Sequence, residues 1–159
     1  MKFKFIGVVA AALLAAACAS NKTGGDGDSS GGDSTGAGGF VRQLQQVGDR
    51  VWFDLDRYDV KPEGMAVLQA QAQLLASYPD VTVRIEGHCD ERGTREYNLA
   101  LGDRRANAVK EALVSFGVDR NRISTISYGK DRPECGTSDE GCWATNRRGV
   151  TTAAGGAGS

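Results

Sequence analysis

The sequence predicts a two-layer α/β sandwich, with a mixed four-stranded sheet, helices on one face and the order βαβαββ. Short segments of alternating polarity, typical of half-buried strands, alternate with two longer segments whose apolar residues recur every three or four positions. The last two strands follow one another without a predicted helix between them. Because the strands alternate in polarity, the outer face of the sheet is expected to be partly solvated.

The first predicted strand is RVWFDL, residues 50–55, which is rich in aromatic and β-branched residues. The first helix is predicted within residues 60–79. Pro62 is placed where a first helical turn tolerates proline, and Pro79 lies beyond the end. Its apolar stripe at helical spacing is Met65, Leu68, Ala72 and Leu75.

The second half of the fold begins with VTVRIEGH, residues 81–88, which alternates as a half-buried strand does. The next helix runs to Phe116 and ends at Gly117, a residue suited to a left-handed cap with Val118 behind it. The third strand is predicted from Ile123 to Tyr128, and the fourth in NRRGVTT, residues 146–152. The sequence AAGGAGS that follows has no β character.

Residues 1–17 have the pattern of a secretory signal peptide. Lys2 and Lys4 give a positive start, and twelve uncharged residues precede Cys18. Spanning a bilayer takes about 20 apolar residues, so this segment is expected to be removed. The surrounding LLAAACAS looks like a lipobox, in which the cysteine receives lipid before cleavage in front of it. An ordinary signal peptide cut after the alanines is the alternative.

Residues 18–39 are predicted to be a lipidated cysteine and a flexible tether. Eight Gly and four Ser stand among the 21 positions after Cys18, a composition that cannot bury enough apolar surface to order itself. A single folded domain is predicted over 40–152 and a flexible tail over 153–159. With 19 Lys plus Arg against 20 Asp plus Glu, the chain has no basic excess that would indicate nucleic acid.

Three cysteines remain after Cys18. Cys135 and Cys142 flank the polar turn GTSDEG, a separation suited to a small disulfide-closed loop in a secreted protein, with two free thiols as the alternative. A metal site that combines them with His88 and Cys89 lacks the CxxC spacing typical of zinc, so no metal or other cofactor is predicted. Cys89 is expected to be a thiol on the core side.

The helix that ends at Phe116 carries two adjacent arginines with different surroundings. Its buried stripe is predicted to be Leu99, Gly102, Ala106, Val109, Leu113 and Phe116. Arg104 falls on the outer face, whereas Arg105 borders the core among small residues. An arginine in that position keeps its charge and requires a carboxylate or a ligand anion. Asp90 and Glu91, in the turn before the helix, are the nearest carboxylates along the chain.

Two interpretations of Arg105 stay open at this point. In one, Arg105 and Asp90 form a plain ion pair that orients the turn. In the other, they form one cation and one anion side by side, open to a zwitterionic ligand.

The segment GHCDERGTREYNLALGDRRANAV, residues 87–109, resembles the OmpA-like peptidoglycan-binding motif. The longer run from Val51 through ISYGKDRPE and WATNRRGV is similar to the peptidoglycan-associated lipoproteins of Gram-negative bacteria. The resemblance covers nearly all of the predicted domain, with the lipobox and the tether. It implies an OmpA C-terminal-like fold and noncovalent recognition of the diaminopimelate in cell-wall stem peptides.

The resemblance also implies residue roles. Asp90 would pair with the diaminopimelate ammonium, and Arg105 would hold its carboxylate with a planar fork that lysine lacks. Further positions that line the family's site, largely through the backbone, correspond to Leu55, Asp56, Cys89 and Leu101. Asn98 and Gly93 would support the turn without touching ligand. No metal or other cofactor is implied.

The resemblance further implies an outer-membrane lipoprotein of the Tol-Pal system, anchored through lipid on Cys18 and facing the periplasm. The family's periplasmic partner TolB, with other Tol proteins, would bind the same face. The predicted contact residues are Glu91, Arg92, Arg95 and Glu96. A protein-interaction module that binds mainly TolB-like partners is therefore the alternative function.

An enzyme is the rival class, because His88 and Cys89 are adjacent and a thiol hydrolase needs such a pair. Adjacent residues of a strand point to opposite faces, however, so the two side chains are not expected to form a nucleophile and base. Binding without catalysis is the prediction.

Overall fold

The computed structural model describes residues 36–154. The predicted signal peptide, Cys18, most of the predicted tether and residues 155–159 lie outside the described residues. In chain order the elements are α1 (Ala37–Val47), β1 (Arg50–Trp52), α2 (Pro62–Ser77), β2 (Val83–His88), α3 (Arg95–Ser115), a short 3-10 turn (Arg120–Arg122), β3 (Ile123–Gly129), α4 (Glu140–Asn146) and β4 (Arg148–Ala153).

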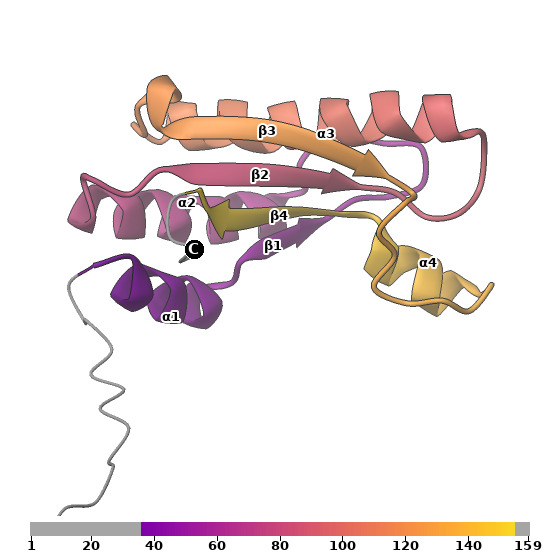
Figure 1. Ribbon diagram of the computed structural model, residues 1–159, viewed down its shortest axis with the longest axis horizontal. Helices are drawn as coiled ribbons and strands as arrows, with labels where there is room; N and C mark the ends of the chain where they lie inside the picture. Colours follow the sequence, from indigo (N-terminus) through magenta and orange to yellow (C-terminus); the bar gives the residue numbers. More distant parts are fainter. Residues whose placement is uncertain (1–35, 155–159) are drawn as a thin grey trace, which may run out of the picture. The chain divides into compact units, whose positions relative to one another are not determined.

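The four strands form the predicted mixed sheet, in the order β1-β4-β2-β3. β4 runs antiparallel to both of its neighbours, β1 and β2, whereas β2 and β3 are parallel. β1, β2 and β3 therefore end at the same edge of the sheet, where β4 begins (Figure 1). α4 lies at this edge, immediately before β4.

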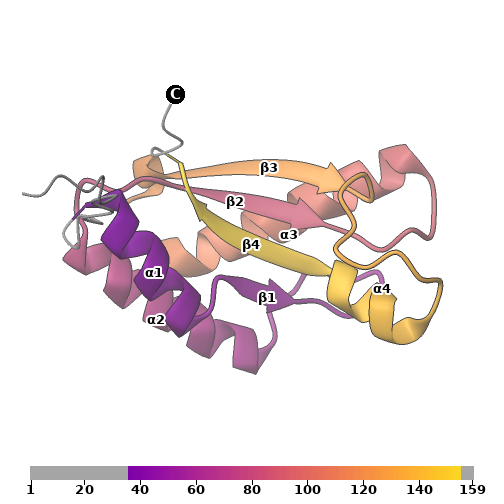
Figure 2. The same ribbon diagram turned by 60° about the horizontal axis from the view of Figure 1, so that its bottom comes forward.

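The hydrophobic core lies between the sheet and the two long helices, α2 and α3 (Figure 2). Sheet residues such as Val83, Ile85 and Ile123 face Leu68, Leu75, Val109 and Leu113 of the helices, and all of them are buried. The opposite face of the sheet carries exposed side chains, including Trp52 and Ile126. The predicted two-layer fold with a partly solvated outer face is confirmed.

Helix α1 corrects the predicted domain boundary. The helix begins at Ala37, inside the segment predicted as tether, whereas the domain was predicted to start at Phe40. Phe40 and Leu44 are buried in the core, and the Phe40 ring meets Tyr78 edge-on at 5.7 Å between centroids. Burial of these two side chains offsets the cost of ordering a glycine-containing helix, which composition alone does not show.

Helix α4 corrects the prediction of a plain turn between Cys135 and Cys142. The Asp139 side chain caps this helix by accepting a hydrogen bond from the Cys142 backbone N–H at 3.0 Å. The two cysteines are joined as a disulfide, as one of the sequence interpretations predicted. The segment between the two cysteines therefore ends in the first turn of α4.

Strand β4 extends through Ala153, one residue past the predicted strand and domain end. Ala154 continues the pairing by donating from its backbone N–H to the Thr82 carbonyl at 2.8 Å. The strand is central and paired on both sides, which overrides the low β propensity of its last residues.

Two glycines bring α3 unusually close to β2. A Cβ on Gly87 would overlap the carbonyl of Gly102, and a Cβ on Gly102 would overlap the Ser127 side chain. Because neither glycine has a side chain, the helix backbone lies directly against the strand backbone. This close contact sets how far Arg105, one turn further along α3, reaches toward the end of β2.

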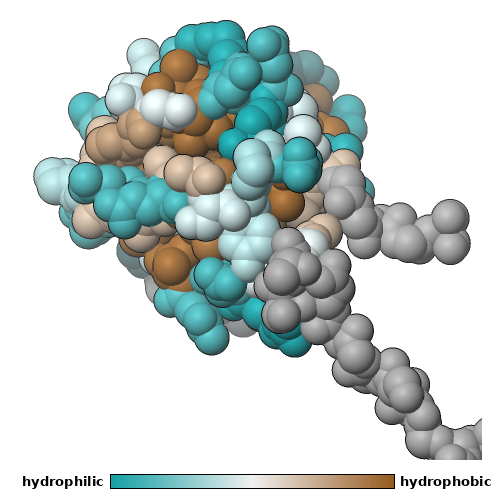
Figure 3. Space-filling model, turned by 90° about the vertical axis from the view of Figure 1, so that its left-hand side faces the viewer, coloured by the Kyte–Doolittle hydropathy of each residue, from teal (hydrophilic) through white to brown (hydrophobic). Residues whose placement is uncertain are grey.

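The surface at the opposite end of the sheet, where β2 and β3 begin, is mixed in hydropathy. Figure 3 views this end, where hydrophobic side chains appear as separate areas between hydrophilic ones.

Among residues 36–154, no helix combines the length and apolarity that crossing a membrane requires.

Candidate functional site

A cavity of about 320 Å³ opens where β1 and β2 end and α3 begins. Its wall combines residues from the loop after β1, the turn after β2, the first half of α3 and the segment before β4. The lining residues are Leu55, Asp56, Cys89, Asp90, Arg92, Gly93, Tyr97, Asn98, Leu101, Arg105 and Arg147. The structure thus brings together every residue that the sequence predicted to line or support a binding site.

Arg105 is fully buried at one wall of this cavity, with its side chain 0% exposed. Its guanidinium donates to three main-chain carbonyls, those of Arg57 (2.8 Å), His88 (2.9 Å) and Asp54 (3.0 Å). It also lies 5.1 Å from the centre of the Phe53 ring. Burial lowers the pKa of Arg105, although an arginine stays charged in proteins. Arg105 therefore ties the ends of β1 and β2 to α3. The main-chain carbonyls take three of its five N–H groups, and the Cys89 thiol is a further neighbour of the guanidinium.

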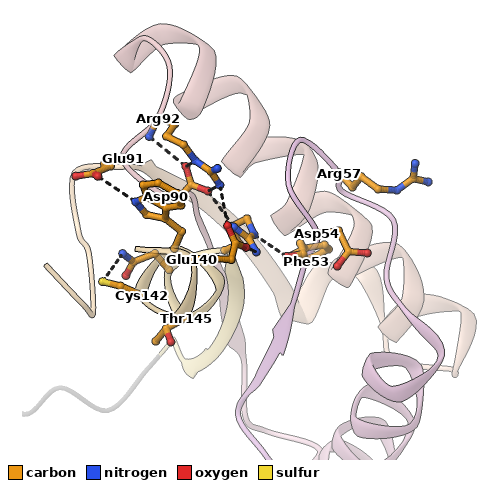
Figure 4. A network of polar contacts seen from close by, with 12 residues as sticks. Phe53, Asp54, Arg57, Asp90, Glu91, Arg92, Glu140, Cys142 and Thr145 are labelled. Carbon is orange, nitrogen blue, oxygen red and sulfur yellow. Dashed lines mark hydrogen bonds and ion pairs between the residues drawn. The ribbon is translucent and has the colours of Figure 1, made fainter. Parts of the chain in front are cut away.

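Asp90 is the anion of the cavity and is 4% exposed. One carboxylate oxygen accepts from the backbone N–H and the Nε of Arg92, at 3.1 and 3.2 Å. The other accepts from Arg92 Nη2 at 2.6 Å and from Arg147 Nη1 at 3.2 Å (Figure 4). Burial alone would raise the pKa of Asp90, but the bonds from Arg92 and Arg147 outweigh it and lower the pKa.

The predicted alternative of a plain Arg105–Asp90 ion pair is wrong. Arg105 donates its hydrogen bonds to carbonyl oxygens, and Asp90 accepts from two other arginines. The reason is geometric: the end of β2 presents the His88 carbonyl directly to Arg105. A buried cation and a buried anion consequently line one cavity without neutralising each other.

Arg147 and Tyr97 line the cavity although the sequence did not predict them, and Arg147 is the one that contacts Asp90. It lies at the end of α4, is 6% exposed, and donates to Asp90, to the Phe53 carbonyl (3.1 Å) and to Glu140 (2.6 Å). The sequence NRRGV contributes to the family resemblance, which implies no role for its first arginine. Two adjacent arginines before a buried strand could have indicated it, because a buried guanidinium requires an anion.

The turn before α3 is held by Asn98 and Gly93. The Asn98 amide donates to the carbonyls of Arg92 (2.8 Å) and Thr94 (3.0 Å), and Thr94 caps the helix by accepting from the Tyr97 N–H at 3.2 Å. Gly93 has φ +89°, a conformation that favours glycine. These contacts favour a supporting role for both residues. Asn98 is 2% exposed, however, and it also belongs to the cavity wall.

The loop after β1 forms the rim of the cavity. Leu55 is 55% exposed, which is high for a large apolar side chain. Asp56 has φ +57°, the left-handed conformation that non-glycine residues seldom adopt. The loop thus carries both an uncovered apolar group and local backbone strain at the mouth of the cavity.

Cys89 and Leu101 form the inner wall. The Cys89 thiol is buried, points to the Asn98 carbonyl at 3.3 Å, and has a pKa raised by that burial. His88 instead lies against the Tyr128 ring, with 5.5 Å between centroids, on the outer face of the sheet. The two neighbours point away from each other and form no nucleophile–base pair.

The four residues predicted to contact a protein partner do not share one environment. Glu91, Arg95 and Glu96 are exposed. Arg95 pairs with Asp131 at 2.8 Å, and Glu91 accepts from the Trp143 indole at 3.0 Å. Arg92 differs because it belongs to the cavity through Asp90. Within residues 36–154, no cluster of three or more His, Cys, Asp or Glu side chains is arranged to hold a metal ion.

A mixed sheet with two helices on one face, and a cation and an anion buried in one cavity at the strand ends, define the class of protein. Residues 52–147 match the OmpA family, and the chain belongs to that family. Its similarity extends to peptidoglycan-associated lipoproteins. The one from Rhizobium meliloti is 50% identical over 92% of this chain and 85% of its own length. The one from Haemophilus influenzae is 40% identical over 92% and 97%.

Solved structures agree with these sequence matches. The crystal structure of the peptidoglycan-associated lipoprotein from Burkholderia pseudomallei has a TM-score of 0.65 and 44% identity, and covers 67% of this chain and 90% of that one. The C-terminal domain of Helicobacter pylori MotB has a TM-score of 0.63 at 22% identity, covering 69% and 86%, and shows the common fold alone. The family and fold predicted from the sequence are confirmed.

Proposed function

We propose that this chain is an outer-membrane lipoprotein that binds peptidoglycan noncovalently through the diaminopimelate of the stem peptide. It would tie the outer membrane to the cell wall as part of the Tol-Pal system, and so serve envelope integrity and constriction during cell division. The family membership and the names of its relatives support the peptidoglycan-associated role. We propose in addition that the ligand is diaminopimelate, that the partners are Tol proteins, and that the protein is anchored in the outer membrane.

The observation that carries the proposal is a buried anion and a buried cation that line one cavity without pairing with each other. Diaminopimelate presents a free ammonium and a free carboxylate on one stereocentre, so it needs an anion and a cation at fixed separation. Asp90 supplies the anion, and its lowered pKa keeps it ionised at neutral pH. Arg105 supplies the cation, with two N–H groups that the main-chain carbonyls leave unused. Both groups are already held in place before ligand arrives, which reduces the entropic cost of binding.

Leu55, Asp56, Cys89 and Leu101 would shape the remainder of the site. Their side chains and backbone form the cavity wall around the two charges. We propose binding without chemistry, because the buried Cys89 thiol has a raised pKa and is not oriented toward His88.

The anchoring part of the proposal rests on the sequence before the described residues. Lipid on Cys18 would hold the protein at the outer membrane, and Ala19 in place of an aspartate agrees with export there in the family pattern. A tether up to about residue 36 would let the domain reach the wall from the membrane surface.

A second function, binding of TolB-like periplasmic partners, is favoured by the exposed charges at the helix entrance. Glu91, Arg95 and Glu96 stand beside the cavity and are accessible. Because a partner on this face would cover the cavity mouth, we propose that wall and partner exclude each other. A ternary titration in which stem peptide and TolB bind simultaneously would overturn this exclusion.

Calorimetric titration of the chain from Ala19 onward with a muropeptide that contains diaminopimelate tests the main proposal. Wild type should bind, whereas Asp90→Asn and Arg105→Ala should each lose binding while still unfolding cooperatively. Asp131→Asn, an exposed carboxylate paired with Arg95, and Arg104→Ala serve as controls and should bind normally. Absence of binding by wild type, or normal binding by the Asp90 variant, would overturn the proposal.

A further inference from the structure

The Asp90 carboxylate has no vacant acceptor position. A carboxylate offers about four acceptor positions. The backbone N–H, Nε and Nη2 of Arg92 take three, and Arg147 Nη1 takes the fourth. A ligand ammonium can therefore reach Asp90 only if one of these donors leaves.

Arg92 is the donor that can leave. Its side chain is 33% exposed, whereas that of Arg147 is 7% exposed and also tied to the Phe53 carbonyl and Glu140. Loss of the Arg92 side chain frees two acceptor positions. Arg147 and the Arg92 backbone N–H would remain and would keep Asp90 ionised.

Helix α4 gives the Arg92 guanidinium a second resting surface. The guanidinium carbon lies 4.0 Å from the centre of the Trp143 ring, within the range of a cation–π contact. Glu140, on the same helix, has a carboxylate oxygen 3.9 Å from Arg92 Nη2. The Cys135–Cys142 disulfide joins α4 to the preceding loop, so both groups are held beside Asp90.

We propose that the Arg92 side chain is a built-in competitor for the ammonium site of Asp90, which sets how tightly a zwitterionic ligand binds. The bidentate contact of the Arg92 side chain with Asp90 is the Arg92 latch. Ligand ammonium displaces the latch, and the freed guanidinium stays between Trp143 and Glu140. This inference rests on the proposed function, because it concerns the ligand of the same cavity.

The Arg92 latch also determines specificity. A cation is required to replace a cation on Asp90, since a neutral group would leave a buried carboxylate with fewer charged donors than before. A ligand with a carboxylate but no free ammonium therefore fails to open the site. Selection for a free amino group then comes from competition as well as from direct attraction.

The first test compares Arg92→Gln with Arg120→Gln in the chain from Ala19 onward. The probe is a disaccharide tripeptide that ends in diaminopimelate. Removal of the latch should tighten binding by about two- to fivefold, the range of one ion pair at a partly exposed position. Arg120 pairs with the exposed Glu111 and does not line the cavity, so its variant should bind as wild type does.

The outcomes separate the two proposals. If wild type binds and Arg92→Gln binds equally or more weakly, the latch is overturned while the proposed function stands. If neither binds, the proposed function fails and the latch fails with it. If only Arg92→Gln binds, the ligand does not displace the Arg92 side chain in wild type, and both the displacement and the proposed function are overturned. The same peptide with its diaminopimelate amine acetylated should not bind wild type, and unimpaired binding would contradict the competition.

A spectroscopic test follows the latch itself. The chain has two tryptophans, so a Trp52→Phe background leaves Trp143 as the sole indole. Displacement of Arg92 from Asp90 changes the position of the guanidinium on the Trp143 ring. Ligand should therefore change Trp143 emission in this background and change it much less when Arg92→Gln is added. An equal change in both proteins would overturn the latch.

Discussion

The interior of this domain has two regions of opposite character. Between the sheet and the helices the buried side chains are apolar, including Leu68, Leu75, Ile85 and Leu113. At the carboxyl ends of β1 and β2, the buried side chains include the polar or charged Asp90, Asn98, Arg105 and Arg147. Both regions are closely surrounded by protein, but the first gains stability from burial and the second costs it unless every charge has partners.

The charged region is organised by main-chain carbonyls and by arginines from separate parts of the chain. Arg105 is satisfied by three main-chain carbonyls, and Asp90 by two arginines that come from the turn after β2 and from the end of α4. Such an arrangement holds two opposite charges apart in one cavity. Burial in the apolar core stabilises the fold and offsets the free-energy cost of burying these charges.

The largest expected effect on stability comes from the close contact of Gly87 in β2 with Gly102 in α3, which lies between the two regions. Gly87→Ala places a Cβ onto the Gly102 carbonyl, so α3 must move away from β2. We expect a loss of about 4 kcal/mol or more in the free energy of unfolding, measured by urea denaturation. Gly136→Ala, at an exposed glycine with open space around it, should cost less than about 0.5 kcal/mol. Similar stabilities for the two variants would contradict the close contact.

Leu113→Ala should damage the apolar region alone. Leu113 is fully buried, and such truncations cost about 2–5 kcal/mol through lost burial and the cavity left behind. Urea denaturation measures the loss. Because Leu113 lies about two turns beyond Arg105 along α3 and does not line the cavity, the folded variant should bind muropeptide with unchanged affinity. A parallel loss of affinity would show that the two regions are coupled.

His88 gives the charged end a pH dependence. Burial, reinforced by nearby Arg148, lowers its pKa to about 4 from 6.5. Between these values the unfolded chain binds a proton that the folded chain refuses, so stability falls as pH drops from about 6.5 toward 4. From pH 7 to pH 4, wild type should lose up to about 3 kcal/mol more than His88→Gln in urea denaturation. Identical pH profiles for the two proteins would refute the shift.

Arg105→Lys should act on the charged region with the smallest energetic effect. Lysine keeps the charge but lacks the planar fork that serves both carbonyls and a carboxylate. We expect muropeptide affinity to fall at least about tenfold, which corresponds to about 1.4 kcal/mol, by calorimetric titration. Arg104→Lys is the matched control, because Arg104 is adjacent to Arg105 but lies on the exposed side of α3. Equal affinities of the two variants would exclude a direct role for the fork.

Much of the fold followed from local patterns in the sequence. The alternating strands, the Pro62 start of α2 and the Gly117 end of α3 depend on neighbours within a few residues. Gly117 has φ +96°, and Val118 donates from its backbone N–H to the Leu113 carbonyl, as the predicted left-handed cap requires. α1 and α4 were missed because their helices depend on burial of Phe40 and Leu44 and on the Asp139 cap beside a disulfide.

The candidate site was predicted in part for the same reason. The pattern of α3 separated Arg105 from Arg104, chain position indicated Asp90 and Glu91, and the resemblance favoured Asp90. The helix wheel underestimated the burial of the side that carries Asn98, Leu101 and Arg105. That side is covered by the loop after β1 and the ends of the strands, which come from distant parts of the chain. No periodicity within α3 contains this information.

The sequence by itself determined most of the strand and helix pattern. It also placed glycine at positions 87 and 102, and one arginine that needed a partner at position 105. Only the tertiary structure decided which partner each charge obtained. It gave Arg105 the carbonyls at the ends of β1 and β2, and it brought Arg147 and Trp143 of α4 to Asp90 and Arg92. The physical reason is that hydrogen bonds and ion pairs depend on distance in space, and these residues lie 48, 17, 51 and 57 positions apart along the chain.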